Sequence, residues 1–146
     1  MTENQESYRA GGENQKLTLR PDLQFSVLCD DVRQELNGKL ILIGLFEAIR
    51  VKMFPVRHAM LFIVNRWRNG EGSFTECTKI VSATNHKVVE GPKALFTLPG
   101  THASHTVIHR FPNVPLEAAG TYWVEIELDG ELIHRYPISL VENDKE

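Results

Sequence analysis

Three histidines lie close together in the second half of the chain, His102, His105 and His109. Imidazole is a common zinc or copper ligand, and on a helix this spacing would bring the three rings to one face. The stretch is typical of a strand instead, in which His105 and His109 share a face but lie roughly 13 Å apart at ~3.3 Å per residue. We therefore expect exposed or edge-strand histidines, without a metal or another cofactor. A metal site would need a further histidine brought in by the fold, from His58, His86 and His134.

A second candidate is the carboxylate group of Asp30, Asp31 and Glu35, which suggests a calcium site or an acid/base pair. Adjacent strand residues point to opposite faces, so Asp30 and Asp31 cannot act on one centre unless a bulge intervenes. A structural role is the better interpretation. We expect one of the two aspartates to accept a backbone N–H near the strand end or to pair with Arg33.

The third candidate is the tripeptide Arg66-Trp67-Arg68, in a stretch from Ala48 to Gly70 that carries five basic residues and no acid. A ring between two cations is typical of single-strand nucleic-acid grooves. The net charge of −3 argues against nucleic-acid binding, which favours strongly basic domains. The alternatives are a solvated face or a protein interface.

Acidic residues gather at the other end, where eight acids follow from Glu117 onward against Arg135 and Lys145. Alternation predicts that Trp123, Glu125 and Glu127 share an outward face, which we take as a candidate interaction surface together with Arg66, Trp67 and Arg68. Opposite charges on two parts of one chain suit self-association, because complementary patches steer encounter. The chain contains no phosphate-binding loop and no Gly-x-Ser-x-Gly elbow. We therefore favour a non-enzymatic module that binds itself or another protein. The alternatives are a small-ligand or metal-binding protein that uses histidines of the 102–109 region, and weak single-stranded nucleic-acid binding.

The elements that must position these residues are strands. Short runs rich in β-branched residues recur at intervals of about 8–12 residues and are separated by Asn37-Gly38, Asn69-Gly70 and Asp129-Gly130. This pattern predicts an all-β fold, an immunoglobulin-like antiparallel β-sandwich of about seven to nine strands, with a small barrel as the alternative. The run 39–51 is apolar on both faces, which predicts a central strand covered on both sides or one that bends between sheets at Gly44.

The clearest stretch runs from Val114 to Val141. Tyr122 begins a strictly alternating strand that ends at Asp129-Gly130, a pair suited to a type I′ turn. The preceding Ala119-Gly120-Thr121 makes the segment similar to a tyrosine corner, in which the tyrosine hydroxyl bonds upstream backbone. The alternative is an ordinary hairpin whose tyrosine only packs.

Length and composition predict one domain. Residues 21–142 should form the sandwich, after a disordered polar tail over 1–20 and before a polar tail over 143–146. Neither a signal peptide nor an apolar run long enough to span a bilayer is visible, so we expect a cytoplasmic protein without membrane contact. Cys29 and Cys77 are interpreted as buried thiols, with a disulfide as the alternative.

Several short motifs carry a resemblance to a known family. They are Leu28-Cys29-Asp30-Asp31-Val32, Gly38-Lys39, Gly44-Leu45-Phe46, Phe54-Pro55, Gly120-Thr121-Tyr122 and Asp129-Gly130. Over Leu23 to Val141 the chain resembles small bacterial β-sandwich proteins catalogued only as a domain of unknown function. The resemblance implies a sandwich fold and a bacterial cytoplasmic protein, and it brings no catalytic residues.

Overall fold

The computed structural model describes residues 18–143, which form ten β-strands and no helix. The strands are β1 (Asp22–Gln34), β2 (Leu40–Phe46), β3 (Ala48–Val51), β4 (Val56–Arg68), β5 (Gly72–Val81), β6 (Lys87–Glu90), β7 (Ala94–Leu98), β8 (Ser104–Leu116), β9 (Gly120–Leu128) and β10 (Glu131–Glu142). The prediction of an all-β fold is confirmed. The predicted polar tails fall mainly on residues 1–17 and 144–146, outside the described residues.

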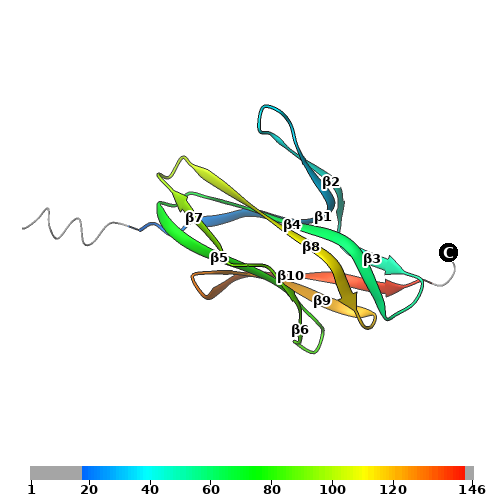
Figure 1. Cartoon of the computed structure of the whole chain (residues 1–146). Helices are drawn as coiled ribbons and strands as arrows, with labels where there is room; N and C mark the ends of the chain where they lie inside the picture. Colours follow the sequence, from blue (N-terminus) through cyan, green and yellow to red (C-terminus); the bar gives the residue numbers. More distant parts are fainter. Residues whose placement is uncertain (1–17, 144–146) are drawn as a thin grey trace, which may run out of the picture.

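The strands form two sheets packed face to face (Figure 1). One has four strands in the order β2-β1-β4-β8, and the other has the order β3-β10-β9-β5-β6, with β7 also paired to β5. Strand pairs are antiparallel except β3 with β10, which run parallel.

Alternation along the strands builds the core between the sheets. On β4, Leu61, Ile63 and Trp67 are fully buried, and on β9 the same holds for Val124 and Ile126. Side chains flip faces at each residue, so each of these strands sends every second side chain into one shared apolar layer. The side chains of both sheets form a single hydrophobic cluster.

The two edges of the four-stranded sheet differ. The β8 edge lies against β6 and β7 of the other sheet, and the His105 ring of β8 stacks on Phe96 of β7 at a centroid distance of 5.0 Å. At the opposite edge, β2 pairs with β1 on one side only, and no strand of the described part of the chain covers its other side. One side of the sandwich is therefore closed and the other ends in an open edge.

The predicted hairpin turns are present. Asp129 and Gly130 have φ values of 50° and 83°, the positive values that a type I′ turn requires. The β1–β2 turn closes through the Glu35 N–H bonded to the Lys39 carbonyl at 2.8 Å, with Gly38 at a φ of 91°. That geometry is a three-residue loop with glycine at its left-handed position.

Tyr122 makes the predicted corner hydrogen bond. Its hydroxyl donates to the Ala118 carbonyl at 2.9 Å, and its ring is buried in the core. The bond ties the start of β9 to the loop that follows β8. The finer assignment to an immunoglobulin-like sandwich stays a prediction.

The prediction for residues 39–51 needs correction. The segment is two edge strands in different sheets, β2 and β3, and the chain crosses between the sheets at Glu47, whose carbonyl accepts the Ser139 N–H at 3.1 Å. The prediction of a central strand covered on both sides is therefore wrong. The bend expected at Gly44 occurs three residues later, since β2 keeps its register with β1 through Phe46.

Among the described residues, no helix is long and apolar enough to cross a membrane.

Candidate functional site

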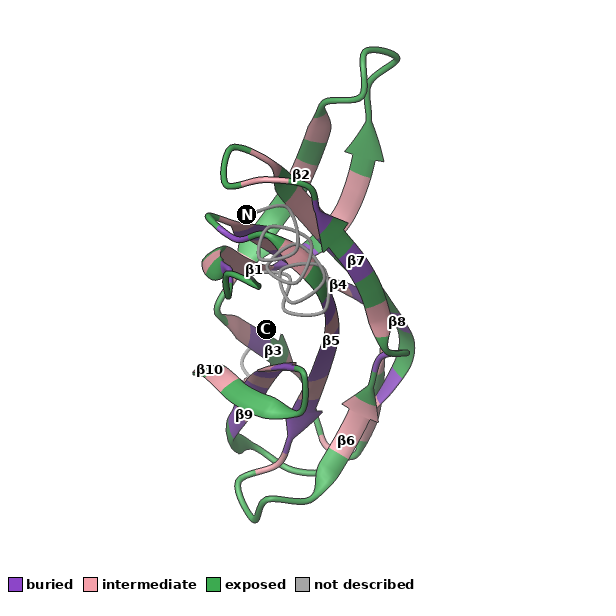
Figure 2. Ribbon diagram, turned by 90° about the vertical axis from the view of Figure 1, so that its left-hand side faces the viewer, coloured by how far each residue is buried: buried purple, intermediate pink, exposed green. Residues whose placement is uncertain are grey.

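One exposed feature of the described chain with several apolar side chains is the hairpin formed by the far ends of β1 and β2. We call residues 31–43 the arm. It projects beyond the two packed sheets (Figure 1), and most of its residues are exposed (Figure 2). Asp31 supports it locally, because its carboxylate accepts the Val32 N–H at 2.8 Å and the Arg33 Nε–H at 2.6 Å. This confirms the structural interpretation of that aspartate.

Edge strand β2 presents a row of aliphatic side chains on the outer face of the sheet. Ile41, Ile43 and Leu45 are 43%, 44% and 62% exposed. They lie opposite Arg33, Asp31 and Cys29 of β1, away from the core. Apolar side chains at every second position of an exposed edge are the pattern that natural sheets usually avoid.

The apolar row continues across the outer face of the four-stranded sheet. Cys29 lies opposite Phe62, and Val64 lies between Val27 and Ile108. Cys29 and Val64 are fully buried among their neighbours, whereas Ile108 at the far edge is 42% exposed. A row of apolar side chains thus crosses the outer face from β2 to β8. Both end strands are paired on one side only, but β8 lies against β6 and β7 of the other sheet, whereas β2 projects away from it (Figure 1).

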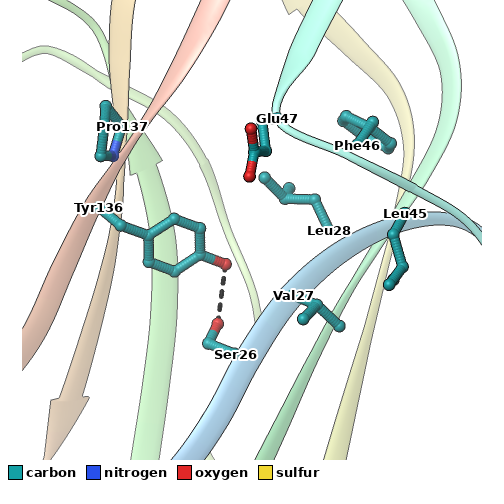
Figure 3. Close-up of a pocket in the computed structure, with 8 residues that line it drawn as sticks. All are labelled: Ser26, Val27, Leu28, Leu45, Phe46, Glu47, Tyr136 and Pro137. Atoms are coloured by element: carbon teal, nitrogen blue, oxygen red, sulfur yellow. Dashed lines mark hydrogen bonds between the residues drawn. The ribbon is translucent and has the colours of Figure 1, made fainter.

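A cavity of about 390 Å³ opens beside the base of the arm, between β1, β2 and β10 (Figure 3). Leu28, Leu45 and Phe46 supply apolar walls. The Ser26 and Tyr136 hydroxyls are hydrogen-bonded to each other at 2.7 Å. Burial raises the pKa of Tyr136 to about 12, with the Ser26 hydrogen bond acting in the opposite direction. The phenol therefore stays protonated and serves to connect the two sheets.

A polar cluster lies buried between the sheets. Its centre is Glu76 of β5, fully buried, whose Oε1 accepts from His109 Nε2 at 2.7 Å and from the Thr78 hydroxyl at 2.6 Å. Its Oε2 accepts from Asn65 Nδ2 at 3.1 Å and from Trp67 Nε1 at 3.3 Å. Four protein donors therefore replace water around one carboxylate.

The electrostatics of this cluster favour the ionised carboxylate. Burial raises the pKa of Glu76, but the hydrogen bonds from His109, Thr78 and Asn65 and the nearby imidazole outweigh it and hold the pKa below its usual value. The His109 ring lies against Gly91, where an added Cβ would stand 2.5 Å from Nδ1. Glu76 and His109 are 0% and 4% exposed, so no substrate reaches them. The arrangement stabilises the fold and offers no route to catalysis.

The two cysteines are free thiols on the outer faces of different sheets. Burial raises the pKa of Cys77 to about 11, and its acceptor Glu90, 3.1 Å from Sγ, adds to the shift. Burial likewise raises the pKa of Cys29. Both thiols stay protonated near neutral pH, so neither has the thiolate character of a nucleophile.

The three clustered histidines are separated by the fold. His102 is exposed in the turn before β8, His105 stacks on Phe96, and His109 binds Glu76. His109 lies on an edge strand as predicted but is buried rather than exposed. Within residues 18–143 no group of three metal-binding side chains forms.

The predicted acidic surface is neutralised within the chain. Glu125 pairs with Arg135 at 3.1 Å, and Glu127 pairs with Lys79 at 3.2 Å. Trp123 is half-buried under the Arg135 guanidinium, which lies 3.9 Å from the ring centroid. These side chains form a ladder on the outer face of the larger sheet.

The Arg66-Trp67-Arg68 tripeptide is divided between the two faces of its sheet. Trp67 is fully buried, stacks on Phe96 at 5.9 Å and donates to Glu76, so it has no ring face free for a base. Arg66 lies on the outer face over Phe25 and bonds Thr106. The basic and acidic candidates thus occupy opposite outer faces of the sandwich, and the fold does not bring them together.

Sequence reasoning did not single out Glu76, Asn65 or Thr78. The alternation could have indicated them, because Glu76 and Thr78 lie on the same face of β5 as the apolar Phe74 and Ile80, and this face points inward. It also did not single out the arm, because the sequence pattern of the run 39–51 predicts a central strand covered on both sides or one that bends between sheets at Gly44.

Comparison with known proteins places this chain in a family. A family model described as a family of unknown function (DUF6941) matches residues 24–141. No curated protein matches the chain. Two solved structures resemble parts of it. One is the Pseudomonas fluorescens alkylpurine DNA glycosylase AlkC bound to DNA containing an abasic site analog (13% identity, TM-score 0.41, 65% of this chain and 28% of that chain). The other is the β-glucosidase from Listeria innocua in complex with isofagomine (9% identity, TM-score 0.45, 83% of this chain and 16% of that chain).

Proposed function

The chain belongs to DUF6941, a family of unknown function, and from its own geometry we propose that it is a non-enzymatic protein-interaction module. Its binding element is edge strand β2, and its partner is an extended protein segment that adds a strand there. The observation that carries the proposal is the row Ile41, Ile43 and Leu45, exposed on a strand with one unpaired edge.

Strand addition fits this edge physically. Main-chain N–H and C=O groups of the open edge supply hydrogen bonds, and alternate side chains supply apolar contact. Complete burial of one aliphatic side chain is worth roughly 1.5–3 kcal/mol. Ile41 and Ile43 are a little under half exposed, so strand addition would gain part of that value at each.

Other features support a module without catalysis. The one buried acid–imidazole pair of the described core is sealed, at 0% and 4% exposure for Glu76 and His109. Burial keeps the thiols of Cys29 and Cys77 protonated by raising the pKa of each. Two free thiols are also compatible with a bacterial cytoplasmic location, which we include in the proposal.

The outer face of β9 is a weaker candidate for the partner surface. Its acids already have basic neighbours in Lys79 and Arg135. Contact between that face and the Arg66 face would join opposite sides of two copies, which is a head-to-tail arrangement that leads to open chains of molecules. Strand addition at β2 has no such consequence.

The proposal is tested by photo-crosslinking in cells that naturally make the protein. A photoreactive phenylalanine analogue replaces Ile43 in one variant and Ile108 in the control. Both isoleucines lie on the outer face of an end strand of the same sheet, at 44% and 42% exposure, but the β8 edge lies against β6 and β7, whereas the β2 edge is uncovered. We expect a discrete protein adduct from position 43 alone, lost when Leu45→Lys is added. Equal adducts from both positions, or none from position 43, would overturn the proposal.

A further inference from the structure

Resting on the proposed function, we propose that the partner strand is β2 of a second copy, paired antiparallel across a two-fold axis at Ile43. The strand runs from Leu40 to Phe46, so Ile43 is its midpoint. An axis there is the one position that pairs all seven residues of the strand with those of its copy. Antiparallel pairing of one segment with itself is the isologous contact of a closed dimer.

In this register each outward aliphatic side chain of β2 lies opposite an aliphatic side chain of the other copy. Ile43 lies beside its copy, and Ile41 lies opposite the copy's Leu45. Directly opposite residues of an antiparallel pair share a face, so six aliphatic side chains become neighbours. The four-stranded sheets of the two copies then join into one sheet, and the apolar row on the outer face runs on from one copy to the other.

Charge at the two ends of the strand matches the same register. The strand itself, LILIGLF, contains no charged residue and no proline, the devices that usually protect an edge. Lys39 precedes it and Glu47 follows it, both exposed, and neither has an ion pair with another residue of 18–143. Glu47 lies just past the strand, where the chain crosses to the other sheet and lines the cavity beside β10 (Figure 3). With the axis at Ile43, Lys39 of each copy comes to the end of the strand at which Glu47 of the other copy lies, which brings one pair of opposite charges to each end of the contact.

Strand β2 keeps its register along its length. Gly44 leaves the extended conformation at a φ of 72°, and the register between β1 and β2 runs without a shift on both sides of it, from Gln34–Leu40 to Leu28–Phe46. The arm projects away from the two packed sheets, which leaves space for the second copy (Figure 1). A seven-residue contact is at the small end of interface sizes, so we expect a concentration-dependent dimer rather than a permanent one.

Sedimentation equilibrium of the purified full chain over a range of concentrations tests this pairing. We expect a monomer–dimer equilibrium that Ile43→Lys weakens by at least about tenfold, with Ile108→Lys as the matched control that leaves it unchanged. Circular dichroism and thermal unfolding verify that each variant is folded. A wild-type chain that stays monomeric, or a dimer indifferent to Ile43→Lys, would overturn the inference.

Charge reversal tests the register. Lys39→Glu and Glu47→Lys should each weaken self-association, by about three- to tenfold, since each places two like-charge pairs across the axis. The double variant should return to within about twofold of the wild type, and an equal mixture of the two single variants should form a heterodimer better than either forms a homodimer. Failure of both rescues would overturn this register.

The two proposals fail in different ways. A monomeric wild-type chain whose position 43 crosslinks to a protein of another mass would contradict self-pairing and leave the interaction module in place. An adduct of twice the chain's own mass supports both.

Discussion

The two edge strands of the four-stranded sheet, β8 and β2, both carry apolar side chains at alternate positions, but their surroundings differ. At β8, alternate residues such as Val107, His109 and Phe111 are buried, and the edge lies against β6 and β7. At β2, alternate residues remain exposed and the edge lies open. An isoleucine on the outer face is exposed to a similar degree at both edges, so composition alone does not distinguish them. The difference lies in whether the backbone edge has a covering element.

The closed edge is tied to the other sheet by Glu76 of β5, the one buried carboxylate among the described residues, which accepts from His109 of β8. Its loss should have the largest effect. Glu76→Ala leaves the His109, Asn65 and Trp67 donors without their acceptor inside the core. Removing one partner of a buried charged pair typically costs about 3–5 kcal/mol. Urea unfolding should show a loss of this size. Glu117→Ala, which removes an exposed carboxylate, should leave the midpoint unchanged. A cost below about 1 kcal/mol for Glu76→Ala would contradict the role of the cluster.

Acid should destabilise the closed side through the same group. The pKa of Glu76 in the folded chain lies below its ordinary 4.5, so the ionised cluster contributes stability above that pH, and this contribution is lost as pH falls through the lower folded value. Unfolding free energies measured between pH 7 and pH 3 should fall more steeply in the wild type than in Glu76→Gln. Parallel pH profiles for the two proteins would show that Glu76 carries no such dependence.

The loop that covers His109 should tolerate no added methyl group. Gly91→Ala places a Cβ against Nδ1 of the imidazole, and overpacking of this kind costs about 1–3 kcal/mol. The matched control is Gly100→Ala, because nothing lies within 4 Å of an added Cβ there. Thermal unfolding of both variants makes the comparison. Equal unfolding midpoints for the two variants would mean that the loop shifts to accommodate the methyl group without cost.

The open edge should respond least in stability. Ile43→Thr changes an exposed side chain, so the unfolding free energy measured at low protein concentration should stay within about 0.5 kcal/mol of the wild type. Self-association should weaken in the same variant. A large loss of stability in the monomer would show that the arm belongs to the core and would remove the contrast between the edges.

Two hairpins and the corner hydrogen bond were predictable from the sequence. The turn pairs Asn37-Gly38 and Asp129-Gly130 marked two hairpins, and the alternation from Tyr122 marked a half-buried strand with its corner hydrogen bond. Those signals are local, because a turn needs only a few residues with suitable φ values. Asp31 likewise found its partner two residues away in Arg33.

The candidate site needed the three-dimensional structure. Glu76 and His109 are 33 residues apart and meet only because β5 and β8 lie in facing sheets. Trp67 looked like an exposed stacking ring beside two arginines, but it lies on the same face of β4 as the buried Ile63 and therefore points inward. The run 39–51 is apolar on both faces whether it is central or at an edge, and sequence periodicity does not say which neighbours a strand has.

Amide hydrogen exchange at several protein concentrations tests the open edge most directly. If β2 pairs with a second copy, the β2 amides that point away from β1 should gain protection as concentration rises, while β8 amides keep their protection. In Ile43→Lys the β2 amides should exchange at the same rate at every concentration. Exchange of the wild-type β2 amides that does not change with concentration would contradict pairing at this edge.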